Sequence, residues 1–318
     1  MTRLEPIEPL WRSVFERAPG HFFQRFEPSL HWARIYAAEG NLRVWTHASE
    51  PALAAFTVRD GQLALLGQGL FDYVDLVGAA TSGAQQQLAR QLLEWEEWRQ
   101  FEATGVPADS PFTSFWQALR AESSLFSAAP LLLHPDRLRP DHGRAARRLR
   151  QCLQAGWELQ PARNGAERQA LLHWILEQKQ QALQASGGRN VLDEAAVQWL
   201  RAMVAHEPEL AELWRLHRDG ETAAGLLCWR STPVRYAYTI SYRSDAAAMS
   251  PGVLLLYGVL CDSAAQGFCF DFLTGEQPFK LRFADARRSL LRLRRRRLEV
   301  LAEEWITHDE SGTEGRFC

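Results

Sequence analysis

The chain has 318 residues, of which 46% are hydrophobic and 23% are charged. This composition is that of a soluble globular protein, so a disordered chain and a small disulfide-stabilised fold are excluded, and the length predicts two domains or one large one. Because 36 basic residues face 38 acidic residues, the formal net charge is −2, and the chain lacks the overall cation excess of broad, non-specific nucleic-acid binders.

Lysine is rare in this chain. It occurs only at Lys179 and Lys280, so arginine supplies 34 of the 36 basic residues. A GC-rich coding sequence explains the abundance of arginine, but it does not explain why these two positions are lysine. Lys179 lies in the polar run EQKQQ and is predicted to occupy the solvated face of a helix. Lys280 ends a longer motif, FDFLTGEQPFK.

The cysteines and the apolar runs indicate the cellular setting. Five cysteines form an odd set with no CxxC pair and no histidine at zinc-ligand spacing, so we expect reduced thiols and no metal site. The start, MTRLEPIEPLW, carries acidic residues where a signal peptide has a basic segment and an apolar core. The longest strongly apolar run, residues 252–261, is too short to span a bilayer. We therefore expect a cytoplasmic protein.

The first half of the chain predicts strands followed by a helix. Extended segments are expected at residues 42–45, 52–58 and 63–66, the last two joined by a hairpin turn at Asp60-Gly61. A helix over residues 85–96 precedes another extended segment at residues 98–105. Residues 131–143 hold two prolines, two aspartates and a glycine, which predicts a domain boundary there. The expected domains are residues 1–138 and 139–318.

The second half predicts helices, then a meander of strands, then a helix and one more strand. Asp219-Gly220 marks a hairpin turn. In the segment RYAYTISYR, strict alternation places Tyr236, Tyr238, Ile240 and Tyr242 on one face of a strand. Helices are expected at residues 144–153, 166–185, 193–205 and 253–265, and strands at residues 211–218, 222–230, 235–243 and 268–273.

This order repeats that of the first half. The fragments FEATG and FDFLTG end matching segments about 170 residues apart, and each follows a hairpin and a helix. The pattern therefore predicts an internal duplication.

The segment SPG, residues 250–252, opens directly into an apolar helix. The first amides of a helix have no partner within it and lie at the positive end of its dipole, which suits a phosphate group. The candidate donors are the amides of Gly252, Val253 and Leu254, with Ser250 before them. The alternative is an ordinary helix start in which Ser250 acts as the N-cap.

The combination of SPG, an apolar helix, a glycine, FDFL and TGEQPFK resembles the acetyltransferase-like proteins of the GNAT superfamily associated with cellulose and exopolysaccharide biosynthesis. It is also similar to the Fem-type aminoacyltransferases that build peptidoglycan. The family usually has tyrosine where this chain has Phe279. The segment GQGLFDYVDL resembles a family segment with an Asp-Tyr-x-Asp pattern, here Asp72, Tyr73 and Asp75. The other matching residues are Ser250, Pro251, Gly252, Gly267, Phe270, Asp271, Phe272, Gly275, Glu276 and Lys280.

The resemblance implies a mixed α/β fold of two tandem GNAT-like acyl-CoA N-acyltransferase domains. The N-terminal copy would be degenerate and the C-terminal copy would carry the donor site. The implied donor is acetyl-CoA or another acyl-CoA, without a metal, and the implied acceptor is an amine in a cleft that the two halves share.

Four residues are candidates for the chemistry of acyl transfer to an amine. Lys280 supplies a compact positive charge that suits a phosphate or an oxyanion. Asp271 could bind the acceptor ammonium or take its proton, or its carboxylate could simply accept bonds from nearby backbone amides. Tyr238 and Tyr242 could protonate a leaving thiolate, or they could serve only as packing groups.

These observations predict an acyl-CoA-dependent N-acyltransferase in cell-surface polysaccharide or glycolipid biosynthesis. Two alternatives remain, an aminoacyl-tRNA-dependent Fem-like transferase and a catalytically silent scaffold of an exopolysaccharide complex. Residues 287–297 contain seven arginines, and the run Leu291-Arg292-Leu293-Arg294 alternates like an edge strand with a solvated face. The same arginines could instead bind an anionic acceptor or a tRNA.

Overall fold

The computed structural model describes residues 4–37, 41–47, 50–138, 143–187 and 192–297. Within them, a mixed sheet of 12 strands runs through the molecule in the order β1-β2-β3-β5-β12-β6-β11-β10-β9-β8-β7, with β4 paired to β2. The strands are β1 (Leu42–Thr46), β2 (Ala52–Arg59), β3 (Gln62–Leu65), β4 (Val77–Gly78), β5 (Gln100–Pro107), β6 (Glu122–Leu132), β7 (Glu158–Pro161), β8 (Ala211–Arg218), β9 (Glu221–Ser231), β10 (Val234–Tyr242), β11 (Cys269–Asp271) and β12 (Ala286–Arg296).

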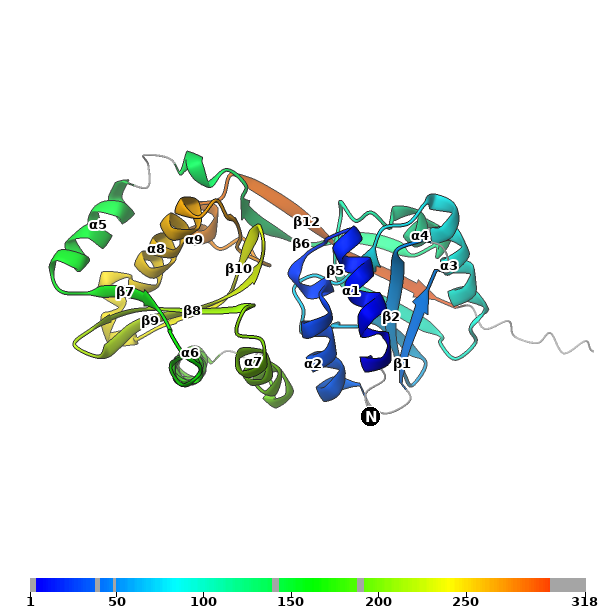
Figure 1. The fold of residues 1–318 in the computed structure, drawn as a ribbon, viewed down its shortest axis with the longest axis horizontal. Coiled ribbons are helices and arrows are strands. Elements are labelled where there is room, and N and C mark those ends of the chain that lie inside the picture. The colour runs from blue at the N-terminus through cyan, green and yellow to red at the C-terminus, as the bar shows by residue number, and fades with distance from the viewer. Residues whose placement is uncertain (1–3, 38–40, 48–49, 139–142, 188–191, 298–318) are drawn as a thin grey trace, which may run out of the picture.

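Helices cover the sheet in two lobes, which Figure 1 shows side by side. Strands β6 and β12 run between the lobes, so the sheet continues from one lobe into the other. The predicted mixed α/β class is therefore confirmed. The N-terminal lobe has α1 (Glu8–Arg17), α2 (Phe26–Tyr36), α3 (Ser82–Glu94) and α4 (Thr113–Ala118), and the C-terminal lobe has α5 (Gly143–Gln154), α6 (Gly165–Ser186), α7 (Glu194–His206), α8 (Pro251–Ala265) and α9 (Pro278–Leu281).

Several helices begin where a side chain can satisfy a free amide. The Asn164 side chain accepts a hydrogen bond from the Glu167 amide (2.9 Å) at the start of α6. The Asp193 carboxylate accepts one from the Ala196 amide (2.7 Å) at the start of α7. Such N-caps stabilise a helix by about 1 kcal/mol each, and they explain why the sequence pattern located these two helices well.

The two lobes repeat one arrangement of strands. In the N-terminal lobe, β2 and β3 form an antiparallel hairpin, and β3 pairs in parallel with β5 after the crossover that contains α3. In the C-terminal lobe, β9 and β10 are antiparallel, and β10 pairs in parallel with β11 after the crossover that contains α8. The expected duplication is therefore present in the topology, with the two copies meeting across β12 and β6.

Strand β12 corrects the prediction of an edge strand at residues 291–294. It lies between β5 and β6 and is antiparallel to both. Its Leu290 and Leu293 are buried, while Arg294 pairs with Glu102 on the adjacent strand (3.1 Å). Alternation alone could not distinguish this strand from an edge strand, because Arg292 and Arg294 pair with Glu102 of the adjacent strand and a central strand can therefore carry them. The division at residue 138 remains a prediction, since β12 pairs with strands that precede it.

One large hydrophobic core extends across both lobes. Phe22 of the N-terminal lobe stacks on Trp229 of β9, with ring centroids 5.2 Å apart, and the Trp199 indole of α7 donates a hydrogen bond to the Pro28 carbonyl (3.1 Å). A second core lies between the other face of the C-terminal strands and helices α5 and α8. The lobes are therefore held against each other by aromatic packing as well as by the continuous sheet.

A bulge in β10 corrects the prediction of a single tyrosine face. The register shifts between Ala237 and Thr239. Tyr236 belongs to the core shared with the N-terminal lobe, whereas Ile240 packs into the core beneath α8. A bulge adds one residue and so reverses the alternation of side chains beyond it. Tyr242 consequently lies beside the start of α8, where a Cβ added at Gly252 would be 3.3 Å from its ring.

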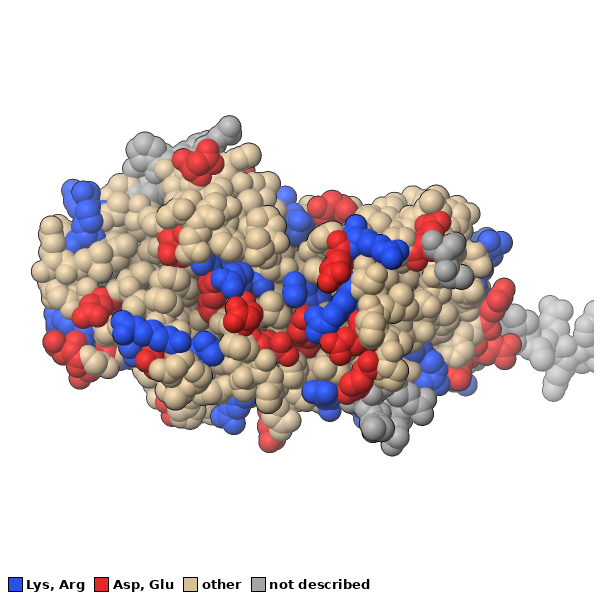
Figure 2. Space-filling view, in the orientation of Figure 1, with Lys and Arg blue, Asp and Glu red and all other residues tan. Residues whose placement is uncertain are grey.

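The face of the molecule in Figure 2 carries acidic and basic side chains interspersed. Red and blue groups alternate along the line where the lobes meet, without a large patch of one sign on this face. Mixed charges of this kind do not give the extended positive field that non-specific binding of nucleic acid requires.

Candidate functional site

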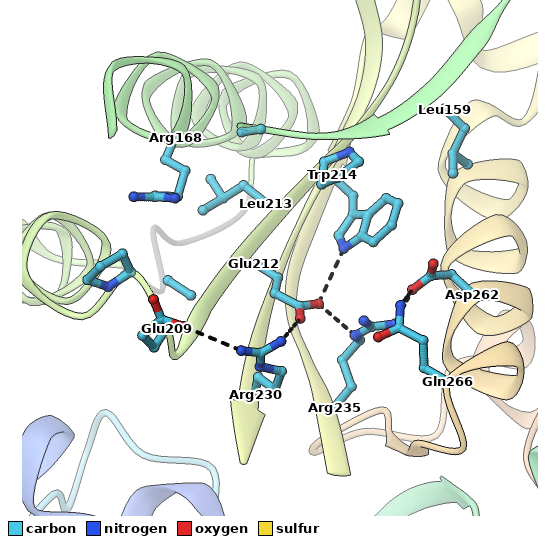
Figure 3. Close-up of a pocket in the computed structure, with 14 residues that line it drawn as sticks. Leu159, Arg168, Glu209, Glu212, Leu213, Trp214, Arg230, Arg235, Asp262 and Gln266 are labelled. Atoms are coloured by element: carbon cyan, nitrogen blue, oxygen red, sulfur yellow. Dashed lines mark hydrogen bonds and ion pairs between the residues drawn. The ribbon is translucent and has the colours of Figure 1, made fainter. Parts of the chain in front are cut away.

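A hollow of about 600 Å³ lies beside the C-terminal end of α8, and its charged groups are drawn in Figure 3. Arg235 is only 1% exposed and lies between the carboxylates of Glu212 (2.7 Å) and Asp262 (3.0 Å). Arg230 also pairs with Glu212 (3.4 Å). We call this region, which also includes Glu209, the arginine pocket. Because Arg230 and Arg235 are already paired with carboxylates, these two guanidinium groups are better explained by ion pairing within the fold than by ligand binding.

The two parallel strands β10 and β11 separate soon after they pair. Their register covers only Val234–Tyr236 and Cys269–Asp271. Beyond this point, a cavity of about 390 Å³ opens between β10 and the chain that follows β11. We call it the strand arm. Its lining residues are Asp72, Lys179, Leu226, Ala237, Tyr238, Thr239, Ile240, Leu256, Phe272, Thr274, Gln277, Phe279 and Lys280.

A second hollow of about 360 Å³ shares part of this lining and extends to the N-terminal lobe. We call it the N-terminal arm. Its other walls include Gln68, Gly69, Thr104 and Phe126. The two arms form one cleft, which we call the lysine cleft, and both lobes contribute to it. The residues that line both arms are Asp72, Lys179, Tyr238, Thr239 and Thr274.

Lys280, for which the sequence motif predicts a functional role, lines the strand arm. Its ammonium donates a hydrogen bond to the Thr274 carbonyl (2.8 Å). Burial lowers the pKa of Lys280, while the carboxylates of Asp72 and Asp271 oppose that shift. The ammonium therefore faces the cleft in a partly desolvated setting.

Lys179 corrects the prediction of a solvated helix face. Its ammonium donates a hydrogen bond to Thr239 Oγ1 (3.1 Å) and lines both arms of the cleft. Burial lowers the pKa of Lys179, and Asp72 opposes this shift. The sequence held a usable signal, because Lys179 falls four residues after the buried Ile175 and seven after the buried Leu172, on the same stripe of α6. The polar neighbours of Lys179 obscured that periodicity.

Asp72 provides the carboxylate of the cleft. It lies in the segment after β3, and its Oδ1 accepts a hydrogen bond from the Thr274 amide (3.1 Å). Burial raises the pKa of Asp72, while the Thr274 hydrogen bond and the charges of Lys280 and Lys179 lower it. The family resemblance identified Asp72 only as part of a motif and gave it no role. Three residues more than 100 positions apart thus meet in one cleft.

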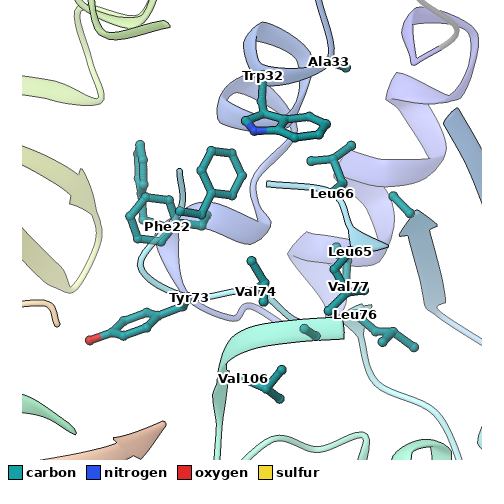
Figure 4. Packing of buried hydrophobic residues seen from close by; sticks show 14 of the residues in the cluster. Phe22, Trp32, Ala33, Leu65, Leu66, Tyr73, Val74, Leu76, Val77 and Val106 are labelled. Atoms are coloured by element: carbon teal, nitrogen blue, oxygen red, sulfur yellow. The ribbon is translucent and has the colours of Figure 1, made fainter. Parts of the chain in front are cut away.

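Asp271, a predicted catalytic residue, lies behind the cleft rather than in its lining. Its Oδ1 accepts hydrogen bonds from the Tyr73 hydroxyl (2.7 Å) and the Leu273 amide (2.8 Å), and its Oδ2 is 3.7 Å from Arg288. Burial raises the pKa of Asp271 to about 6. In Figure 4 the Tyr73 ring extends away from Val74, with its hydroxyl at the outer end. This geometry favours the alternative of an aspartate satisfied by its neighbours, which fixes the loop that carries Thr274.

The two candidate tyrosines occupy different places. Tyr238 lines both arms, and its ring packs against Trp199 and Trp229 with centroids 6.0 and 5.5 Å away. Burial raises the pKa of Tyr238 far above its usual value, so the hydroxyl keeps its proton. Tyr242 is 50% exposed and lies on the α8 side of β10, because of the bulge. The structure brings Tyr238 to the cleft and leaves Tyr242 outside its lining.

The start of α8 partly corrects the predicted phosphate donors. Ser250 has a left-handed backbone (φ +56°) and makes no side-chain cap. Its carbonyl accepts the amides of Val253 (3.1 Å) and Leu254 (3.2 Å), which are therefore engaged. Among the described residues, the Gly252 amide has no such acceptor. Arg148 of α5 donates to the Ala248 and Met249 carbonyls (3.1 and 3.0 Å), which places a guanidinium beside this turn.

Other candidate features are few in the described residues. Cys152, Cys228, Cys261 and Cys269 are free thiols, and Cys318 lies outside the described residues. In the part of the chain that the structure describes, no group of three His, Cys, Asp or Glu side chains is placed to hold a metal ion. None of its helices combines the length and hydropathy needed to cross a bilayer.

A family model described as an acetyltransferase (GNAT) domain matches residues 136–281, which include α8, β11 and the lysine motif. The chain has a GNAT-like fold. The split parallel strands β10 and β11 lie within the matched segment, as do the lining residues of the strand arm other than Asp72. No curated protein matches the chain.

Solved structures match the fold of this chain across both lobes. FemX superposes with a TM-score of 0.62 at 11% identity, covering 90% of this chain and 95% of FemX. L-PGS from Bacillus licheniformis gives a TM-score of 0.61 at 10% identity, covering 91% of each chain. The C-terminal domain of a putative lysylphosphatidylglycerol synthetase from Agrobacterium fabrum gives 0.59 at 11% identity, again covering 91% of each. These likenesses confirm the expected fold, while the resemblance to exopolysaccharide-type proteins stays a prediction.

Proposed function

We propose that the protein is an acyl-CoA-dependent N-acyltransferase that acts on an amine, with acetyl-CoA as the simplest donor. The observation that carries the proposal is the lysine cleft, which opens where β10 and β11 separate in a GNAT-like fold. A donor can enter through the strand arm while an acceptor enters through the N-terminal arm. The assignment to cell-surface polysaccharide or glycolipid synthesis rests on sequence resemblance alone.

The donor side uses the free edge of β10 and the start of α8. Among the described residues, no strand pairs with β10 on the β11 side beyond Tyr236, so an amide of this edge can polarise the thioester carbonyl. We assign the pyrophosphate to the Gly252 amide, the positive end of the α8 dipole and the nearby Arg148 guanidinium. Lys280 then faces the reacting group and stabilises the developing oxyanion.

The acceptor side centres on Asp72. Its carboxylate binds the incoming ammonium and takes a proton from it, which the raised pKa favours. The free amine attacks the thioester carbon, the C–N bond forms and the C–S bond breaks. The proton left on the nitrogen after the attack passes to the departing thiolate, and the Tyr238 hydroxyl, which lines both arms and keeps its own proton, donates a hydrogen bond to that sulfur. Asp72 therefore replaces Asp271 as the proposed base, because only Asp72 lines the cleft.

Release of free coenzyme A thiol tests this proposal. The protein is incubated with acyl-CoAs of several chain lengths and a panel of primary amines, and acyl-CoA binding is measured by calorimetry. Asp72→Asn is expected to lower kcat/KM by about 10²- to 10³-fold, since a general base contributes that much. Asp60→Asn is the matched control, because this aspartate is 93% exposed. Absence of binding heat with every acyl-CoA would refute the acyl-CoA donor.

The two other readings have distinct outcomes. An aminoacyl-tRNA-dependent transferase would bind charged tRNA in a filter-binding assay. Addition of an amine acceptor would then convert the charged tRNA into uncharged tRNA. The interspersed charges in Figure 2 do not favour it on that face. A silent scaffold would capture a polysaccharide synthase without any turnover, and Lys280→Ala would leave that capture unchanged.

A further inference from the structure

The lysine cleft contains more positive than negative charge. Its lining includes two ammonium groups, Lys179 and Lys280, and one carboxylate, Asp72. Among the described residues, neither lysine lies within 4.0 Å of a carboxylate oxygen, and both donate instead to neutral oxygens of Thr239 and Thr274. A partly buried charge without a counter-ion is costly, so a fold retains it where a ligand supplies the opposite charge.

The arginine pocket provides a contrast, because two of its cations are held in direct ion pairs. There Arg235 meets Glu212 and Asp262 directly. The lysine cleft uses the other basic residue type and leaves it without such partners. An ammonium is a compact, mobile point charge, which suits an anion that comes and goes, whereas a guanidinium suits a fixed planar pairing.

The two lysines also lie in different parts of the cleft. Lys179 lines both arms, including the N-terminal arm with Gln68 and Thr104, whereas Lys280 lines the strand arm alone. Asp72 lies in the lining of both arms with Lys179. An amine that also carries an anionic group would therefore find a carboxylate for its ammonium and an ammonium for its anion at the junction of the two arms.

We propose that Lys179 binds an anionic group of the acceptor, either a carboxylate or a phosphate, and that Lys280 in the adjoining strand arm adds its positive charge to the field at this site. The acceptor is then an amino acid-like or aminoalkyl phosphate-like amine rather than a simple amine. That the bound molecule is the acceptor rests on the proposed function, whereas the existence of an anion site does not. Its test is therefore a binding experiment that needs neither acyl-CoA nor turnover.

The scarcity of lysine makes the site directly observable. Protein labelled with 13C-lysine has only two ε-methylene signals, and Lys179→Met and Lys280→Met assign them. The signals are followed by NMR during titration with glycine, O-phosphoethanolamine and ethanolamine. We expect glycine, O-phosphoethanolamine or both to move both signals saturably, and ethanolamine, which has no anionic group, to move neither. If only one of the two anionic probes binds, or one binds more tightly, that probe identifies the carboxylate or the phosphate as the group that the site prefers.

The variants measure how far the two lysines act together. In Lys179→Met, the Lys280 signal is expected to need about 10- to 100-fold more of the anionic probe, the usual effect of losing a hydrogen bond between charged groups. Arg59→Met is the matched control, since this arginine is 86% exposed and should leave both signals unchanged. Unaltered binding in Lys179→Met would overturn the two-lysine site, and so would the absence of any shift at roughly 50 mM of either anionic probe. An equal response to ethanolamine would overturn it too.

Titration in the presence of coenzyme A shows whether the lysines bind an anion of the acceptor or of the donor. If the anion belongs to the acceptor, saturating coenzyme A leaves the response to glycine or O-phosphoethanolamine in place. Loss of the response would assign the lysines to the donor phosphates and overturn the acceptor assignment. If coenzyme A does not bind at all, the acyl-CoA proposal fails, while the titrations without it still decide the anion site.

A kinetic readout completes the test. With an anionic acceptor, Lys179→Met should raise KM about 10- to 100-fold and change kcat by less than about 3-fold, because Lys179 binds the acceptor without taking part in the chemistry. With a neutral acceptor KM should change far less, because such an acceptor has no anion for Lys179 to bind. An equal loss of kcat for both acceptor classes would contradict this role.

Discussion

The two lobes build the same parallel strand pair but treat its opening differently. In the N-terminal lobe, β3 and β5 pair over Gln62–Ala64 and Gln100–Glu102, and the chain after β3 then closes the gap. The Gln68 side chain accepts the Thr104 amide (2.8 Å), and the Gly105 carbonyl accepts the Val74 amide (3.2 Å). In the C-terminal lobe, the corresponding gap between β10 and β11 is the strand arm of the lysine cleft.

This difference explains how a duplication can yield one site instead of two. The segment that closes the N-terminal gap, residues 68–74, also carries Asp72 into the cleft of the other lobe. One copy has thus become a wall that supplies a carboxylate, and the other has kept the opening. Because the sheet is continuous through β6 and β12, the wall is held in a fixed position against the opening.

Lys280→Arg tests the open copy and should have the largest effect among the four variants that compare the two lobes. A planar guanidinium cannot take the place of an ammonium that donates to the Thr274 carbonyl at 2.8 Å. We expect kcat/KM to fall by about 100-fold, the loss typical of a misplaced donor to an oxyanion, with little change in the unfolding midpoint.

The reverse exchange, Arg230→Lys in the arginine pocket, is the matched control. It should leave kcat/KM within about 2-fold, because Arg230 lies outside the lysine cleft and a partly exposed ion pair contributes little free energy. Full activity of Lys280→Arg in the thiol-release assay would remove Lys280 from the reaction.

Gly105→Ala tests the closed copy. Gly105 has φ +94°, and a Cβ there would lie 2.6 Å from the Asp72 carbonyl oxygen. Both the backbone strain and the clash oppose alanine, so we expect the free energy of unfolding in urea to fall by about 2–3 kcal/mol. Activity should fall as well, because the displaced segment carries Asp72.

Gly165→Ala is the control, since a Cβ there meets nothing within 4 Å at the start of α6. Unchanged stability of Gly105→Ala would show that the closing segment yields easily, and the contrast between the lobes would lose its physical basis.

Local signals explain what the sequence predicted correctly. The turns at Asp60-Gly61 and Asp219-Gly220 fix hairpins whose strands are adjacent in sequence. The helices α6 and α7 have side-chain caps and periodic apolar residues. Each of these features depends on fewer than about a dozen neighbouring residues, which is the range over which turn chemistry and periodicity act.

The missed features depend on distant parts of the chain. β12 looks like an edge strand until β5 and β6 are known to flank it. The bulge after Ala237 reverses the tyrosine face because of pairing with β9. The lysine cleft depends on topology, since nothing near Asp72 in the sequence indicates Lys179 or Lys280.

The Asp75→Asn variant tests the packing of the closed copy through the pH dependence of its free energy of unfolding. Burial raises the pKa of Asp75 to about 7, against hydrogen bonds from Ser110 and the Leu76 amide that lower it. Because the folded pKa exceeds the unfolded value of about 4, this group stabilises the fold at low pH, and that stability is lost as the pH rises toward 7 and beyond. Asparagine removes the buried charge, so the variant should gain on the order of 2 kcal/mol over the wild type at pH 8 and little near pH 4.

Urea unfolding of both proteins across this pH range measures the difference, in which the other titrating groups cancel. Asp60→Asn should give a difference that does not vary with pH, since that carboxylate is 93% exposed. A flat difference for Asp75→Asn would show that water reaches this carboxylate and that the closing segment is less tightly packed than its contacts suggest.

Gly252→Ala returns to the open copy and should have the smallest effect. A Cβ at Gly252 would lie 3.3 Å from the Tyr242 ring, which is half exposed and can move aside, so the stability should hardly change. The methyl group would stand beside the one predicted donor amide that has no acceptor among the described residues. We expect acyl-CoA affinity by calorimetry to fall about 3- to 10-fold, a fraction of a charged hydrogen bond. An unchanged affinity would place the pyrophosphate away from the start of α8, and the open copy would then hold its donor through the lysine cleft alone.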